Sequence, residues 1–502
     1  MIRRMPMSKI IMSAGLLVLC STVGALEAGD AEKADYLRAC GAYAHAMIER
    51  GRDTYGEEHS PLFAATLNRN THKLENIGPG PEGIRSGDRT TYGANPMHDL
   101  NLYQILYSFS EITGDRRYSE EADRALSFFF ENCQNQRTGL MAWGEHLGWD
   151  FHRDAVKPKG RGRNRTLIHE FYGPWVLWDR CFELAPEACE KFAKGLWQYQ
   201  IYDKETGQFS RHATWDEGPH GAKSEFPRHA GFYIETWAKA YEQTRDPEFL
   251  KYIDTMLNFF TSHRQPLTML LPCDSEHPYR AWPESELSLA ISLGSSAHRV
   301  RVNMRKKIRE FAAASDRAFS NVKNDLSPDG KGFVACADTK TGDQWDAQPH
   351  PWPRPKPFAA AYGQTSEANR AMLCYLRYQQ LEEGDAKQMY TKLALGSADR
   401  YLRRDPDPDA TVFPGVMGDV IYLLVSAYEL TDDRKYLNRA DHFAEFALQK
   451  LFGEESALPK ASSRLSHYEA ITRADTLMMA LLQLWQVENR PGLKLHLIYT
   501  DR

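Results

Sequence analysis

Three short segments of the sequence contain side chains that commonly bind metal ions. WGEH ends at His146, IHEF contains Glu170, and FSRH ends at His212. Two imidazoles and one carboxylate form a mixed nitrogen and oxygen set, which suits a divalent transition metal and leaves coordination positions open for a substrate. Arg211 immediately precedes the last of these residues. We therefore predict a metal centre with a guanidinium beside it.

A loose internal repeat indicates how the surrounding elements are arranged. Three segments, starting at Leu106, Thr236 and Leu423, each combine an amphipathic helical pattern, a short break and a second helical pattern. Each break holds a Thr, an Asp two residues later and an aromatic residue three further on: Thr113, Asp115 and Tyr118; Thr244, Asp246 and Phe249; Thr431, Asp433 and Tyr436. We expect the Asp to cap the second helix and the aromatic ring to pack on its first turn.

Such helical hairpins cannot cover their apolar stripes alone, so they are expected to stack on one another. Strand patterns are few and short, whereas further helical patterns cover residues 35–50, 173–200, 284–322, 364–402 and 473–488. We predict an all-α fold, an α/α toroid (barrel) of six to seven helical hairpins that forms a single domain over residues 29–502. An open α-solenoid is the alternative.

Long connections rich in Gly, Pro and aromatic residues favour the toroid over the solenoid. They cover residues 60–97, 134–168, 203–230 and 325–362. Inserts of this kind usually line a site on one rim of the fold. His146 and His212 fall in two successive long connections and Glu170 lies just after the first of them, so the three predicted metal ligands can converge on one rim.

The composition and the N-terminal segment indicate which molecules the protein can bind and where it is located. The balance of 42% hydrophobic and 26% charged residues is typical of a globular protein, and the net charge of −5 gives no general attraction to nucleic acid. Residues 1–25 combine a basic start, an apolar run and small residues before Ala25, which predicts a signal peptide and an exported, periplasmic or secreted protein. No later run approaches the ~18 apolar residues of a membrane span. We expect a monomer.

The cysteines give no disulfide framework. Seven remain outside the signal segment, and they are scattered without a CxxC motif. We expect most of them to be buried thiols. Cys181 and Cys189 are close enough in sequence to pair across a helix end.

Taken together, the three ligand-bearing segments resemble the periplasmic pectate lyases of polysaccharide lyase family 2. That family has a WGGH-like, a VHELK-like and an SRH segment in the same order, and the resemblance covers mainly residues 139–213. It implies that His146, Glu170 and His212 bind a divalent metal, manganese or a similar ion, and that Arg211 is the catalytic base. The implied reaction is β-elimination on a pectate-like polyuronate.

The sequence departs from the family pattern beside two of the predicted ligands. Glu145 stands where the WGGH-like segment has its second glycine, and Phe171-Tyr172 replace the Leu-Lys of the second segment. The metal-binding residues survive these changes. The identity of the uronate is the property that the changes put in question.

The implied reaction is consistent with the residue types. The C5 proton of a uronate lies α to the carboxylate, and a metal bound to that carboxylate stabilises the charge that develops when a base removes the proton. Because arginine is normally charged, Arg211 as a base needs a neighbouring cation and shielding from water. His169 and Lys223 are alternative bases, and a charged Arg211 would instead clamp the carboxylate.

Basic and aromatic residues near these segments are candidates for substrate binding. A basic, Gly-rich loop lies between the first two predicted ligands, and Arg228 and His229 precede a predicted helix. The predicted substrate-binding residues are Lys157, Lys159, Arg161, Arg163, Arg165, Lys223, Arg228, Trp143 and Trp215. Each tryptophan has a core position as its alternative, because buried tryptophan is the commoner case.

Two other functions remain open. One is a glycoside hydrolase or sugar epimerase on the same toroid, and the other is a non-catalytic glycan-binding protein. A hydrolase needs two carboxyl groups across the scissile bond; Asp150, Asp216, Glu217 and Glu225 are available but form no recognisable pair. If the protein is a lyase, its predicted partner is an acidic polysaccharide or oligosaccharide.

Overall fold

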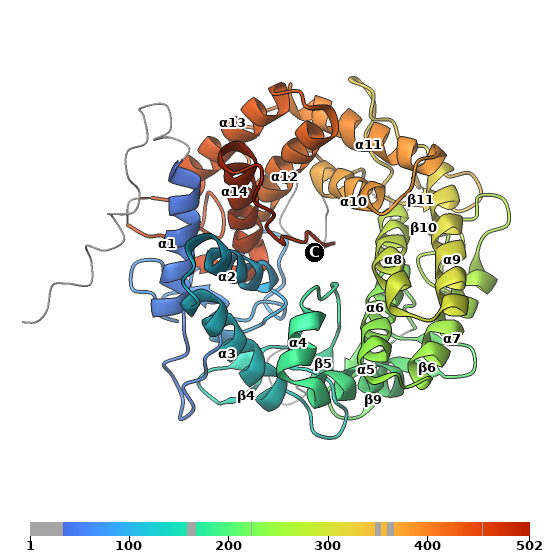
Figure 1. The fold of residues 1–502 in the computed structure, drawn as a ribbon, viewed down its shortest axis with the longest axis horizontal. Coiled ribbons are helices and arrows are strands. Elements are labelled where there is room, and N and C mark those ends of the chain that lie inside the picture. The colour runs from blue at the N-terminus through green and yellow to red at the C-terminus, as the bar shows by residue number, and fades with distance from the viewer. Residues whose placement is uncertain are drawn as a thin grey trace, which may run out of the picture.

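The computed structural model of the protein describes residues 34–157, 167–221, 223–346, 353–358, 366–453 and 455–501. Its helices form a closed ring with an inner and an outer layer (Figure 1). The inner helices are α2 (Leu100–Thr113), α4 (Trp178–Leu184), α6 (Pro227–Thr244), α8 (Pro283–Ser296), α10 (Glu367–Gln379), α12 (Pro414–Thr431) and α14 (Ala474–Asn489). The outer helices are α1 (Ala34–Arg50), α3 (Arg117–Asn132), α5 (Pro186–Gln200), α7 (Glu248–His263), α9 (Val302–Ser320), α11 (Asp385–Tyr401) and α13 (Lys435–Leu451). Seven helix pairs in the described residues confirm the predicted α/α toroid.

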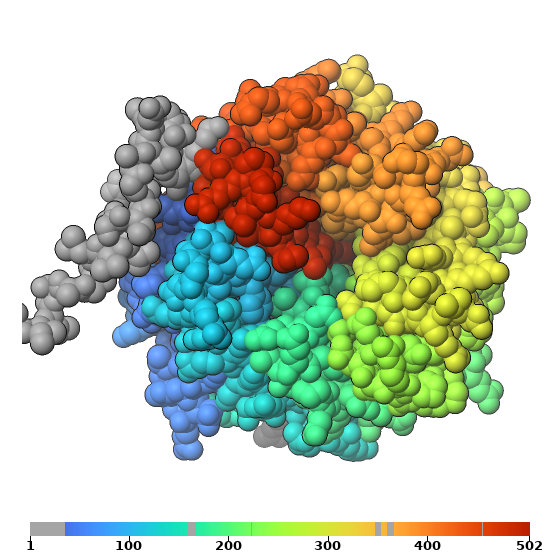
Figure 2. Space-filling view, in the orientation of Figure 1, coloured from blue at the N-terminus to red at the C-terminus, as the bar shows by residue number. Residues whose placement is uncertain are grey.

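The ring closes where the first and the last helices of the chain meet. α1 packs against α14, and the Cys40 thiol donates to the carbonyl oxygen of Met478 at 3.1 Å. The hydroxyl groups of Tyr43 and Tyr468 lie 3.2 Å apart in the same region. In Figure 2 the red C-terminal part of the chain lies directly against the blue and cyan N-terminal helices. The seventh hairpin therefore combines one helix from each end of the chain.

The Thr/Asp breaks form the hairpin turns as predicted. In the α2–α3 turn, the Asp115 carboxylate accepts from the N–H of Arg117, the first residue of α3, at 2.9 Å. Asp246 and Asp433 accept from the first N–H of α7 and α13 in the same way, each at 3.0 Å. These carboxylates satisfy N–H groups that have no partner inside the helix. The capping function predicted from the sequence is confirmed in all three turns.

Three of the predicted helical spans are divided in the structure. The pattern over 173–200 splits into α4 and α5 at Ala185, whose φ of −142° and ψ of 64° lie outside the helical region. Pro186 explains the break, because it disfavours the helical conformation of the residue before it and begins α5 where its missing N–H costs nothing. The pattern over 284–322 divides into α8, a 3₁₀ turn (Ala297–Arg299) and α9, and that over 364–402 into α10 and α11.

The strands are short and join the long connections to one another. Antiparallel pairs link β1 to β12, β10 to β11 and β6 to β7, and three-stranded sheets join β2–β3–β4 and β5–β8–β9. The strands are β1 (Thr66–Leu67), β2 (Gly93–Ala94), β3 (Trp149–Asp150), β4 (Ala155–Val156), β5 (Ile168–His169), β6 (Ile201–Asp203), β7 (Gln208–Phe209), β8 (Ala213–Thr214), β9 (Gly218–Pro219), β10 (Arg280–Ala281), β11 (Ala337–Asp338) and β12 (Tyr468–Glu469); a 3₁₀ turn (Ala470–Thr472) follows β12. The ring thus supplies a rigid frame, and these strands order the loops mounted on it.

The remaining predictions about the chain as a whole have different outcomes. The predicted signal peptide, residues 1–25, lies outside the described residues. Among the described helices, none combines the length and apolarity needed to cross a membrane. The seven cysteines after residue 25 are buried thiols, as expected, and Cys181 and Cys189 are not joined in a disulfide. The boundaries of the predicted single domain remain a prediction.

Trp143, three residues before the first predicted ligand, is fully buried in an aromatic cluster. Its ring stacks on Phe171 with centroids 5.5 Å apart and contacts Trp175 at 4.9 Å and Phe192 at 5.4 Å. The prediction that Trp143 binds sugar is therefore wrong, because a covered ring offers no face to a ligand. Its position instead ties the loop that carries His146 to the core.

We expect Trp143→Ala to lower the free energy of unfolding by about 3–5 kcal/mol, the usual cost of emptying a large aromatic site. Urea unfolding followed by circular dichroism measures this loss. Leu267→Ala is the matched control, because Leu267 is 75% exposed and its removal should change stability by less than about 0.5 kcal/mol. Equal losses in both variants would contradict the core position of Trp143.

Candidate metal centre

Backbone pairing brings the three ligand-bearing segments together. β5 pairs with β8 so that His169 lies opposite Ala213, which places Glu170 across from His212. Gly144 forms a parallel bridge to Glu170. Gly144 has a φ of +106°, and a Cβ atom there would lie 2.0 Å from the carbonyl oxygen of Glu170. Only glycine permits this approach, so the WGEH segment can lie against β5.

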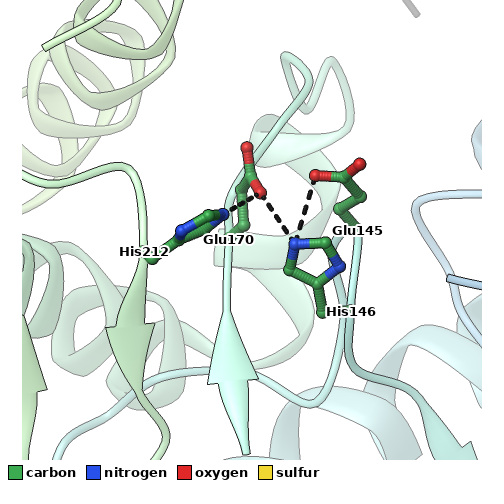
Figure 3. Close-up of side chains that lie close together, drawn as sticks. All are labelled: Glu145, His146, Glu170 and His212. Atoms are coloured by element: carbon green, nitrogen blue, oxygen red, sulfur yellow. Dashed lines mark hydrogen bonds and ion pairs between the residues drawn. The ribbon is translucent and has the colours of Figure 1, made fainter. Parts of the chain in front are cut away.

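The predicted ligands and Glu145 point toward one another (Figure 3). The Nε2 atom of His212 lies 2.8 Å from Oε2 of Glu170. The Nε2 atom of His146 lies 3.3 Å from the same oxygen and 3.3 Å from Oε2 of Glu145. One donor atom from each of the four side chains lies within 4.8 Å of the others. The structure thus brings together the three residues predicted from the sequence and adds a fourth.

Glu170 is the centre of the group. Its carboxylate is almost fully buried and also contacts Nε2 of His229 at 3.0 Å and a guanidinium nitrogen of Arg211 at 2.5 Å. Burial by itself raises the pKa of Glu170, but the hydrogen bonds from His146, His212 and His229 and the charge of Arg211 outweigh it and hold the pKa well below its ordinary value. Glu170 is therefore anionic at neutral pH, the form in which a carboxylate can bind a metal ion.

His146 is held from behind by Asp88. The Nδ1 atom of His146 lies 2.7 Å from Oδ1 of Asp88, and both side chains are buried. Burial raises the pKa of Asp88, but its bonds to His146 and Arg85 outweigh this and lower it, so Asp88 can only accept. The Nδ1 atom of His146 must then carry the hydrogen, and its Nε2 atom faces the carboxylates of Glu145 and Glu170.

This arrangement of donors fits a divalent cation. Metal bonds of about 2.0–2.2 Å hold neighbouring ligand atoms about 3–3.5 Å apart, the range found here between His146 and the two carboxylates. A lone pair of neutral His146 aimed at two anionic oxygens needs a positive charge between them, either a proton or a metal ion. Without a metal, the bonds to Asp88 and Glu170 overcome the effect of burial and raise the pKa of His146. Burial lowers the pKa of His212, which favours the neutral form that binds metals.

We expect Asp88→Asn to weaken metal binding by about 10–100-fold, the usual effect of removing the carboxylate that orients a metal-bound histidine. The substitution preserves the shape of the side chain but removes its charge and its preference for one histidine tautomer. Isothermal titration with Mn²⁺ measures the change. An unchanged affinity would show that Asp88 does not orient His146.

The alternative bases lie apart from the metal-type cluster, which is formed by Glu145, His146, Glu170 and His212. His169 faces the other side of β5 from Glu170, and its Nδ1 atom lies 2.9 Å from Oε1 of Gln200. It is completely buried, and burial lowers its pKa to about 4. Lys223 is exposed in the connection before α6. Of the three candidate bases, Arg211 is the one that contacts a predicted ligand, Glu170.

The predicted substrate-binding residues have varied positions. Lys159, Arg161, Arg163 and Arg165 lie outside the described residues. Lys157 donates to the carbonyl oxygen of Arg89, and burial lowers its pKa to about 8. Arg228 pairs with Asp501 at 3.1 Å. Trp215 is half-buried at the end of β8. Lys157 and Arg228 are thus partly exposed but already paired with protein groups, and Trp215 and Lys223 are candidates as well.

Sequence reasoning missed part of the site. Asp88 and Arg85 belong to a loop whose residue spacing carries no signal, and they reach the site through long-range contacts. His229 was recognised as a polar residue before a helix, but its contact with Glu170 was not. Glu145 was recognised only as a departure from the family pattern.

Comparison with known proteins supports the predicted resemblance. Residues 61–231 match the family model described as periplasmic pectate lyase, and this segment contains the whole metal-type cluster. A pectate disaccharide-lyase from Dickeya dadantii (strain 3937) is 23% identical over 119 residues, which are 24% of this chain. The matched part covers only 21% of that relative.

One solved structure shares the fold, and a second is less similar. A D-mannose isomerase has a TM-score of 0.50 at 10% identity, covering 92% of this chain and 100% of its own. A cellobiose 2-epimerase from Bacillus thermoamylovorans B4167 has a TM-score of 0.48 at 9% identity, covering 89% and 99%. At 10% identity, the similarity to the D-mannose isomerase concerns the toroid fold alone. The segment that carries the candidate metal centre, residues 61–231, is thus related to the periplasmic pectate lyases, as its motifs predicted.

Proposed function

We propose that the protein is a metal-dependent polysaccharide lyase that cleaves a pectate-like polyuronate by β-elimination. The observation that carries the proposal is the convergence of His146, Glu170 and His212 on one point, with Arg211 in contact with Glu170. The relationship of residues 61–231 to periplasmic pectate lyases supports the same reaction. An acidic polysaccharide is then the substrate, and an exported location gives access to it.

The reaction removes the C5 proton of a uronate and breaks the bond between C4 and the glycosidic oxygen. The electron pair of the C5–H bond forms the C4–C5 double bond, and the glycosidic oxygen leaves with its bonding electrons and takes up a proton. A divalent ion, manganese or a similar metal, supplies positive charge that stabilises the carboxylate as negative charge develops on it. His146, Glu170 and His212 are the residues that would hold this ion.

Arg211 takes the C5 proton in this proposal. Its side chain is 26% exposed, and its guanidinium lies over the ring of Phe226, 5.0 Å from the centroid. Shielding from water and a neighbouring positive charge both favour the neutral form of a guanidinium. Its contact with the Glu170 carboxylate favours the charged form instead. Arg211 would therefore act as a base only if a bound ion neutralised the charge of Glu170, so its role as a base would depend on metal binding.

A panel of polyuronates tests the proposal. The full-length protein is incubated with polygalacturonate and with other polyuronates, with Mn²⁺ or with a chelator, and the unsaturated product is followed by its ultraviolet absorbance. We expect product with polygalacturonate and Mn²⁺ and none with the chelator. If no polymer gave an unsaturated product, the proposed lyase activity would be wrong. Turnover that survives chelation would favour a hydrolase or epimerase, and saturable binding without turnover would favour a glycan-binding protein.

A further inference from the structure

The two carboxylate oxygens of Glu145 have separate surroundings. Oε1 accepts from the guanidinium of Arg85. Oε2 lies 3.3 Å from Nε2 of His146 and 3.5 Å from Nη1 of Arg211. The side chain is only 11% exposed, so most of it is removed from bulk water. Arg85 therefore holds Oε1, and the other oxygen, Oε2, points toward His146 (Figure 3).

We infer that Glu145 is a fourth protein ligand of the ion, which turns the predicted set of two histidines and one carboxylate into two histidines and two carboxylates. The inference rests on the metal site of the proposed function. It is carried by Oε2 of Glu145, which has the same 3.3 Å separation from Nε2 of His146 as the predicted ligand Glu170 has. The four donor atoms lie within 4.8 Å of one another, so one ion can contact all four after small side-chain movements.

Arg85 is the positioning residue for this ligand. Its guanidinium contacts Oδ2 of Asp88 at 2.5 Å and Oε1 of Glu145. Asp88 in turn holds Nδ1 of His146. A single side chain thus sets the orientation of Glu145 directly and that of His146 through Asp88. An accidental surface ion pair would involve Glu145 alone, whereas this contact fixes two neighbouring donors at once.

The second carboxylate changes the charge of the centre. Two glutamates balance the two positive charges of a divalent ion, whereas one glutamate leaves a net positive charge. A balanced ion is held more firmly by the protein and attracts a substrate carboxylate less strongly. The extra oxygen donor also shifts the preference toward metals that accept carboxylates, such as manganese. With Glu145 as a ligand, the ion attracts the substrate carboxylate less strongly. Protein side chains must then supply more of the binding to that carboxylate.

Mn²⁺ binding to the full-length protein tests the inference without any substrate. Glu145→Gln keeps the shape and removes the charge, and Glu145→Ala removes the side chain. We expect both to weaken Mn²⁺ affinity in isothermal titration by more than about 100-fold, beyond the usual effect of an outer partner. We also expect proton relaxation of solvent water to report additional water on the bound Mn²⁺ in Glu145→Ala. Glu121→Gln is the matched control, because Glu121 lies on the outer helix α3 and pairs there with Arg52 and Arg124 rather than with any of the four side chains of the cluster.

The possible results separate this inference from the proposed function. Full affinity in both Glu145 variants, together with loss of binding in His146→Ala, would overturn the role of Glu145 and leave the metal site intact. Weaker affinity with no additional water on Mn²⁺ in Glu145→Ala would make Glu145 an outer partner and also overturn the inference. A wild-type protein that binds no divalent ion would overturn both. Thermal melting of each variant without metal shows whether the fold is preserved.

Discussion

Replacing either His146 or His212 by alanine is expected to reduce lyase activity by at least about 10²–10³-fold, because a metal supplies several kcal/mol of charge stabilisation and each 1.4 kcal/mol changes the rate about tenfold. Both imidazoles face Oε2 of Glu170, so the loss of either one opens the cluster on one side. Metal analysis of the purified variants should show substoichiometric Mn²⁺. The lyase assay on polygalacturonate should show the matching loss of activity.

The control for these variants is His298→Ala, which removes an exposed histidine from the turn after α8. It should retain both Mn²⁺ and activity. The two histidine variants should also regain little activity in excess Mn²⁺, since they lack a ligand rather than the ion. Full activity of His146→Ala and His212→Ala in the presence of chelator would show that the reaction does not use this centre.

Arg211→Ala is expected to lower kcat/KM by about 10²–10⁴-fold, the contribution typical of a general base. Arg211 contacts Glu170 at 2.5 Å and lies beside His212, so its loss also removes a positive charge from the site. For this reason the Mn²⁺ affinity of the variant must be measured together with its activity. A variant that binds Mn²⁺ normally and turns over slowly places the defect in the reaction itself.

Arg211→Lys separates a base from a carboxylate clamp. Lysine loses its proton at lower pH than arginine, so a base at position 211 should shift the acidic limb of the pH–rate profile to lower pH. A clamp would instead raise KM, with kcat and the pH profile nearly unchanged, because lysine keeps the charge but lacks the forked geometry. The second result would reassign Arg211 from base to clamp. Arg180→Ala, which removes an arginine paired with Asp123 on α3, is the matched control.

Local sequence patterns predicted the ring because the residues that form each hairpin turn lie within that turn. Thr113, Asp115 and their equivalents form hydrogen bonds within a few residues, so their function can be read from sequence alone. The breaks at Pro186 and after α8 and α10 were missed because continuous amphipathic patterns run through them. Helical periodicity indicates which face is buried but does not tell one bent hairpin from one long helix.

The metal-type residues were predictable for a different reason. His146, Glu170 and His212 combine ligand chemistry with family motifs in a set order, and short strands then bring them together. Asp88 and His229 contact the cluster through residues far away in sequence, and no local sequence pattern predicts such contacts. Trp143 shows the limit for aromatic residues, because stacking on a sugar and packing in a core require the same ring. Only the observed burial separates these two uses.

The closure of the ring has a consequence for how the chain folds. The contact between Cys40 and Met478 joins residues 438 positions apart, so the last hairpin cannot form until nearly the whole chain is available. Contacts this distant in sequence slow folding, because chain entropy must be lost before they contribute. Until α14 reaches α1, the growing arc exposes two apolar edges. The assembling protein is therefore most prone to aggregation just before closure, when most of the arc has formed and both edges are still uncovered.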